Sequence, residues 1–134
     1  MIITRDQAAI AAMQAEKLAR AKAAGQARLI EAMAAARLAF VTPLPGQDMV
    51  YLAKEAEARA WVAAIAPVLS DYPLLLAEVG ITAPDADQLA QLWLNMAALW
   101  RAAAAQLEAL RLSTQAAIEA AVSPEEVTAI MDAF

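Results

Sequence analysis

Alanine accounts for 39 of the 134 residues, and this abundance constrains the fold more than any other feature of the sequence. Alanine is the strongest helix former because it loses no side-chain entropy when a helix orders. Only three glycines and six prolines are present to interrupt helices. The chain is therefore predicted to be all-α, with long helices in a bundle or coiled coil and a proline-punctuated middle segment.

Start and stop signals divide residues 1–134, taken as a single helical unit, into four segments. Thr4 and Gln7 have the spacing of a capping box, which predicts a long N-terminal helix in residues 1–40. Two prolines and a glycine within residues 43–46 then break the helix. A turn and shorter helices are expected over residues 41–81, the first of them capped by Asp48.

A second long helix is predicted over residues 82–122. Thr82 offers a hydroxyl cap, and carboxylates follow in the first turn, where the helix dipole favours negative charge. Ser123 and Glu126 then have the cap spacing of a last short helix over residues 123–134.

A four-three spacing of apolar residues runs along the second long helix. One set falls seven residues apart: Leu89, Met96, Ala103, Leu110 and Ala117. The other set lies four residues beyond each member of the first: Trp93, Trp100, Leu107, Thr114 and Ala121. This spacing is typical of a coiled coil or of a long bundle helix, and it fits a seam within one chain and a seam between chains equally well.

Large aromatic and apolar side chains are the candidates for an interface. Trp93 and Trp100 lie one heptad apart and form one aromatic stripe, which is expected to pack in a core or against a partner. Aromatic residues dominate the binding energy of many protein interfaces. The full set of interface candidates is Trp93, Met96, Trp100, Leu107, Leu110, Tyr51, Trp61 and Tyr72.

The chain contains no histidine and no cysteine. This excludes disulfides, thiol catalysis, the commonest general base and the commonest ligands of transition metals. Glu55 and Glu57 are two residues apart, which places them about 200° apart around a helix, so they make no acid–base pair. We therefore predict no catalytic, cofactor-binding or metal-binding residues and do not expect an enzyme.

The charge is unevenly distributed along the chain. Residues 1–40 hold six basic and three acidic side chains, whereas residues 41–134 hold four basic and twelve acidic ones. This asymmetry favours attraction between subunits and argues against nucleic acid as a partner. No apolar run reaches the roughly 18–20 residues of a membrane-spanning helix, and no secretory signal is visible, so synthesis in the cytoplasm without membrane insertion is expected.

Several segments resemble small tail-associated proteins of bacteriophages and prophages. The clearest is residues 42–58, where a proline–glycine turn and a short polar motif lead into an alanine-rich helix. The alanine-rich opening of the chain also resembles the helical C-terminal regions of phage tail-fibre proteins. Further segments with this likeness are residues 72–82, 100–102, 117–121 and 123–126.

The resemblance implies a structural subunit of a phage virion, in a tail fibre, a tail tip or as a baseplate accessory protein, that acts through helix packing and oligomerisation. It implies that the partners are the chain itself, with a trimer as the favoured oligomer, and other tail proteins. The location would then be the virion tail. An alternative is an assembly chaperone or adaptor for a fibre or spike that is absent from the virion. The resemblance brings no catalytic residues and no cofactor.

Overall fold

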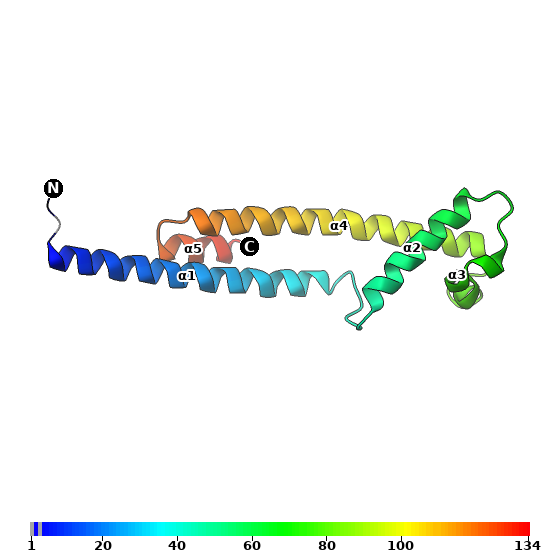
Figure 1. Cartoon of the computed structure of the whole chain (residues 1–134), viewed down its shortest axis with the longest axis horizontal. Coiled ribbons are helices and arrows are strands. Elements are labelled where there is room, and N and C mark those ends of the chain that lie inside the picture. Colours follow the sequence, from blue (N-terminus) through cyan, green and yellow to red (C-terminus); the bar gives the residue numbers. More distant parts are fainter. Residues whose placement is uncertain (1, 3) are drawn as a thin grey trace. The chain divides into compact units, whose positions relative to one another are not determined.

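The structure, a computed structural model, describes residue 2 and residues 4–134. This part of the chain contains five α-helices and one short 3-10 helix (Figure 1). In chain order they are α1 (Arg5–Arg37), α2 (Gln47–Ala63), η1 (Leu69–Asp71), α3 (Pro73–Glu78), α4 (Ala86–Ala120) and α5 (Pro124–Asp132). The predicted all-α fold with long, mutually packed helices is confirmed.

The described residues group into two compact units. Unit 1 contains the chain up to Arg37 together with Gln106–Phe134, and so comprises α1, the C-terminal part of α4, and α5. Unit 2 is Leu38–Ala105 and comprises α2, η1, α3 and the N-terminal part of α4. Each unit has its own cluster of buried apolar residues.

In unit 1 the short helix α5 lies between α1 and α4 (Figure 1). Leu29 on α1 and Ile118 on α4 are fully or almost fully buried, and Val127 of α5 packs with both. Gly25 lets α5 approach closely, because a Cβ atom at this position would lie 2.7 Å from Cγ1 of Val127. Helix α1 continues through Gly25 without a break, so this glycine provides room for α5.

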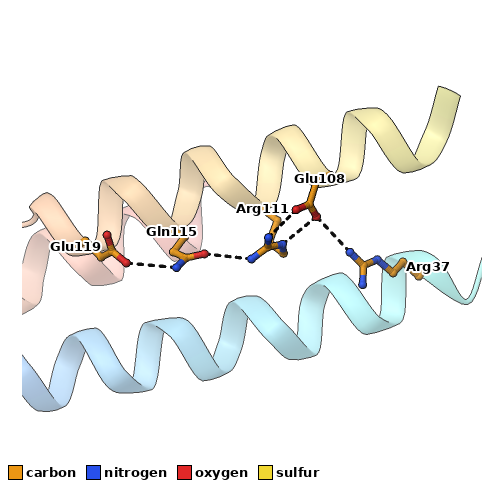
Figure 2. Close-up of polar contacts among 5 residues, drawn as sticks. All are labelled: Arg37, Glu108, Arg111, Gln115 and Glu119. Atoms are coloured by element: carbon orange, nitrogen blue, oxygen red, sulfur yellow. Dashed lines mark hydrogen bonds and ion pairs between the residues drawn. The ribbon is translucent and has the colours of Figure 1, made fainter. Parts of the chain in front are cut away.

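Polar side chains also connect α1 to α4 within unit 1 (Figure 2). Arg111 donates two hydrogen bonds to the carboxylate of Glu108, at 2.9 and 2.6 Å, and Nη2 of Arg37 on α1 lies 3.5 Å from the same carboxylate. Gln115 accepts from Arg111 and donates to Glu119. Arg37 links α1 to α4 in this polar ladder, and its other contacts run along α4.

In unit 2 the core forms where α2, α3 and α4 meet. Its buried members are Ala58 on α2, Leu75 on α3, and Leu89, Ala90 and Trp93 on α4. Ala58, Ala90 and Leu75 are fully buried, and Trp93 is 5% exposed.

Glu57 attaches α3 to α2. Its two carboxylate oxygens accept hydrogen bonds from the backbone N–H groups of Leu74 and Leu75, at 3.0 and 2.9 Å. Because α3 begins at Pro73, these N–H groups belong to its first turn and have no partner within the helix. Glu57 is therefore the cap of a helix that follows 16 residues later in the sequence.

Two of the predicted helix starts are confirmed. The backbone N–H of Thr4 donates to Oε1 of Gln7 at 3.0 Å, and the N–H of Gln7 donates to Oγ1 of Thr4 at 3.2 Å, which completes the capping box. At α5 the N–H of Glu126 donates to Oγ of Ser123 at 3.1 Å. Gly80 also has the left-handed φ, 86°, expected after a helix end.

The other two predicted caps are wrong. Helix α2 is preceded by Gly46, with a left-handed φ of 82° and no side-chain cap, and Asp48 lies inside the first turn. Helix α4 begins at Ala86 rather than residue 82, and its N-terminal N–H donor at Gln88 is capped by Asp85 at 2.8 Å. Pro84 disfavours helical conformation in the residue before it, so Thr82 lies too early to act as the cap.

The predicted seam of α4 is correct for one set of residues and partly wrong for the other. The set Trp93, Trp100, Leu107, Thr114 and Ala121 is buried or half-buried as predicted. In the companion set Leu89 is buried and Ala103 is half-buried as predicted, but at the other three positions the next residue faces inward instead: Ala97, Arg111 and Ile118. Met96 and Leu110 are instead 54% and 44% exposed.

Candidate functional site

Unit 2 contains a groove of about 420 Å³, which we call the α2–α4 groove. Its walls come from the start of α2, the exposed side of α4, the segment that precedes α2, and the end of α3. The lining residues are Phe40, Val41, Asp48, Tyr51, Leu52, Lys54, Glu55, Glu78, Thr82, Leu92, Trp93, Met96, Ala97 and Trp100.

Apolar side chains make most of the groove surface, and several remain open to water. Trp93 is only 5% exposed, so it forms part of the core as well as the wall. The rings of Phe40 and Trp100 lie 6.4 Å apart at an angle of 48°. Phe40, Leu52 and Met96 are 50%, 65% and 54% exposed. A concentration of exposed apolar surface around aromatic residues is typical of a binding site for another protein.

An ion pair closes one end of the groove. Nζ of Lys54 lies 2.6 Å from Oε2 of Glu78 and 5.0 Å from the ring centroid of Trp93, a cation–π contact. Thr82 donates a hydrogen bond to the other oxygen of Glu78 at 2.6 Å. Burial raises the pKa of Glu78, but the hydrogen bonds from Lys54 and Thr82 outweigh it, so the pKa is lowered overall. Glu78 is therefore ionised at neutral pH.

A second carboxylate joins α2 to α4 beside the groove. Oε1 of Glu55 lies 2.7 Å from Nη2 of Arg101 and 2.8 Å from Nη2 of Arg59, and its side chain is only 10% exposed. The hydrogen bond from Arg101, followed by the one from Arg59, lowers the pKa of Glu55. Glu55 and Glu78 are thus acceptors in fixed ion pairs, and the chemistry that the groove offers is the binding of an apolar surface.

Half of the eight interface candidates meet in this groove. They are Tyr51, Trp93, Met96 and Trp100. The hydroxyl of Tyr51 donates to Oγ1 of Thr42 at 3.0 Å, which ties the segment before α2 to the helix.

The other four candidates lie elsewhere. Trp61 and Tyr72 pack edge to face at 5.1 Å inside unit 2, and Nε1 of Trp61 donates to Asp87 at 2.7 Å. Leu107 is half-buried against the core of unit 1. Leu110 lies on the exposed side of α4 in unit 1.

Sequence reasoning missed several groove residues. Phe40 was expected inside a long helix, but α1 ends at Arg37 and Phe40 lies in the segment that leads to α2. Lys54 binds Glu78 on α3, which follows 24 residues later in the sequence. No local pattern in the sequence marks either contact.

A second hollow, of about 430 Å³, lies in unit 1 beside the start of α5. Its surface comes from alanine, polar and charged side chains together with Leu18, Val122 and Pro124. It contains no aromatic side chain. The α2–α4 groove is therefore the better candidate for a binding site.

Comparison with known proteins returns no matching family model, no matching curated protein and no matching solved structure. None of the described helices has the length and apolar character needed to cross a membrane. Among the described residues, no group of three or more acidic side chains gathers in a way that could hold a metal ion.

Proposed function

We propose that this protein is a structural subunit of a bacteriophage tail, in a tail fibre, tail tip or baseplate, and that its α2–α4 groove binds a helix of a neighbouring tail protein. One observation carries the binding part of the proposal. Phe40, Leu52 and Met96 line one groove around Trp100 and leave half or more of their surface in water. Burial of this surface by a partner would release roughly 25 cal/mol for each Å² of apolar area removed from water.

The charges of unit 2 indicate the chemistry of the partner helix. Unit 2 holds three basic and seven acidic side chains, and Asp48 is the charged groove residue that has no ion pair among the described residues, because Glu55 pairs with arginines and Glu78 with Lys54. Complementary charge steers association and suppresses wrong partners. We therefore expect an amphipathic helix with an apolar stripe of leucine, methionine or aromatic residues and with lysine or arginine along its edge.

The assignment to a phage tail is supported by the resemblance of residues 42–58 and of the alanine-rich N-terminal segment to tail-associated proteins. The helical architecture, in which long helices present apolar stripes, agrees with a subunit that works by packing against its neighbours. The alternative role, an assembly adaptor that leaves before the virion is complete, would use the same groove.

The test uses particles of the phage or prophage that encodes this chain. Met96→Glu places a charge in the groove, and Leu112→Glu is the matched control because Leu112 is 50% exposed on the same helix in unit 1. Mass spectrometry of purified particles should find the wild-type chain and the Leu112→Glu variant at a fixed ratio to a known tail protein. The Met96→Glu variant should be depleted by about tenfold, because a buried unpaired carboxylate costs more than about 1.4 kcal/mol. Circular dichroism of both purified variants verifies that each remains helical.

The other outcomes are also informative. Recovery of the wild-type chain from infected cells with a fibre protein, but not from particles, would favour the adaptor role. Equal incorporation of both variants would rule out the groove as the binding site. Absence from particles together with no association with any tail protein would refute the phage-tail assignment.

A further inference from the structure

The N-terminal part of α1 adds no side chain to the core of unit 1, although Gln14 and Lys17 line the hollow beside the start of α5. Every residue from Arg5 to Lys17 is exposed, and Figure 1 shows this end of α1 extending beyond α5 and the end of α4. An isolated helix of this length is marginal in water, even when it is rich in alanine. A partner for this segment would stabilise it.

The exposed segment has a four-three-four seam of its own: Asp6, Ile10, Met13 and Lys17. Ile10 and Met13 are 51% and 52% exposed. At 100° per residue this seam lies roughly 110° around the helix axis from the face that carries Gly25 and Leu29 into the core of unit 1. Ile10 and Met13 are therefore available to a partner without any disturbance of the core of unit 1.

The seam is complementary to itself when two copies run antiparallel. With the two-fold axis between residues 11 and 12, Ile10 of one copy lies opposite Met13 of the other, and Asp6 lies opposite Lys17. In an antiparallel coiled coil, each a position of one helix packs opposite a d position of the other, and both of these pairs are of that kind. Two-fold symmetry repeats each pair, so the apolar centre has an ion pair at both ends.

A parallel arrangement would be unfavourable for the same segment. It would place Asp6 opposite Asp6 and Lys17 opposite Lys17, and like charges in contact are strongly disfavoured. In the described residues Asp6 and Lys17 have no ion-pair partner, so both are available to the second copy. The flanking residues Ala9 and Ala12 are small enough to let two helices approach closely.

We infer that two copies of this chain form an antiparallel, two-fold symmetric helix pair through residues 5–17 of α1. The inference goes beyond the proposed function and does not depend on the groove or on the phage assignment. The segment is about 20 Å long, so the pair buries less than the roughly 1,600 Å² of a standard interface. The dimer should therefore dissociate in the micromolar range, unlike an obligate oligomer.

Charge reversal tests the pairing in the full-length protein. Asp6→Lys and Lys17→Asp, each alone, place like charges opposite one another and should raise the dimer dissociation constant about tenfold or more in sedimentation equilibrium. The double variant Asp6→Lys/Lys17→Asp restores opposite charges and should return the dissociation constant close to that of the wild type. The double variant keeps the same lysine near the N-terminus of α1, so an effect on the helix dipole alone would not be rescued.

A spin-label distance tests the orientation. The chain contains no cysteine, and Ile30 is 68% exposed, so Ile30→Cys gives one specific site for a nitroxide label. Antiparallel pairing centred between residues 11 and 12 places the two labels about 55 Å apart along the helix axis, whereas parallel pairing places them within about 20 Å.

Three results would overturn the inference. The first is a wild-type chain that stays monomeric up to half-millimolar concentration. The second is a double charge-reversal variant that associates as weakly as the single variants. The third is a short label-to-label distance or a trimer in the sedimentation data.

Discussion

Units 1 and 2 share helix α4 but complete their packing in different ways. In unit 1 the nine residues of α5 fill the space between α1 and α4, and the polar ladder of Figure 2 bridges the two long helices. In unit 2 the core centres on Trp93 and Leu75, and the aromatic surface continues into an open groove. This difference underlies both of our proposals, that unit 2 receives a foreign partner and that the exposed end of α1 in unit 1 pairs with a second copy.

The largest loss of stability is expected when Trp93→Ala is combined with Trp100→Ala. Truncation of a buried aromatic residue typically costs about 3–5 kcal/mol, and Trp93 is 5% exposed. Native-state hydrogen exchange should show that amides of α2 and α3 lose protection while those of α5 keep it. Equal loss of amide protection in units 1 and 2 would show that the two cores do not unfold independently. Unchanged protection would refute the assignment of Trp93 to a core.

A smaller effect on stability is expected from Gly25→Ala in unit 1, and its sign should depend on the residue at position 127. Gly25→Ala gains about 1 kcal/mol of helix propensity, but its Cβ would meet Cγ1 of Val127 at 2.7 Å, and overpacking costs about 1–3 kcal/mol. Because Val127 is β-branched, its side chain has few alternative rotamers that could relieve this contact. We expect Gly25→Ala to destabilise the wild-type chain and to stabilise a Val127→Ala background. Chemical denaturation measures both, and the same sign in both backgrounds would contradict the close approach of α5.

The smallest effect is expected on the pH dependence of stability, through Glu55 in unit 2. Because Arg101 and then Arg59 lower the pKa of Glu55, its contribution to stability is present above the ordinary glutamate pKa and is lost as the pH falls through the lowered value. Glu55→Gln should reduce stability at neutral pH and flatten the loss of stability between about pH 5 and pH 3. Thermal melts across this range measure the slope. Glu31→Gln is the control, since Glu31 is exposed and has no ion pair in the described residues, and an equal flattening there would contradict the role of Glu55.

Features that depend on neighbouring residues were predictable from the sequence. The capping box at Thr4, the helix cap at Ser123 and the left-handed Gly80 are confirmed because their hydrogen bonds and dihedral angles are set within a few residues. The register of the α4 seam was only half predictable. Alanine occupies both candidate registers, as at Ala97 and Ala103, so hydrophobicity alone does not distinguish them.

Contacts between distant residues could not be predicted. The ion pair of Glu55 with Arg101 spans 46 residues, and Glu57 caps a helix 16 residues away. The aromatic positions that line the groove, Tyr51, Trp93 and Trp100, were identified as interface candidates from residue type alone. Their convergence depends on the packing of α2 against α4, and no spacing in the sequence encodes it.

Photo-crosslinking in assembled particles tests the central claim, that unit 2 binds the foreign partner, most directly. Benzoylphenylalanine would replace Met96 in the groove or, as the matched control in unit 1, Leu112, since these side chains are 54% and 50% exposed. The account predicts a crosslink from position 96 to a helix of another tail protein and none from position 112. Crosslinks from position 112 alone, or from neither position in particles that contain the chain, would contradict it.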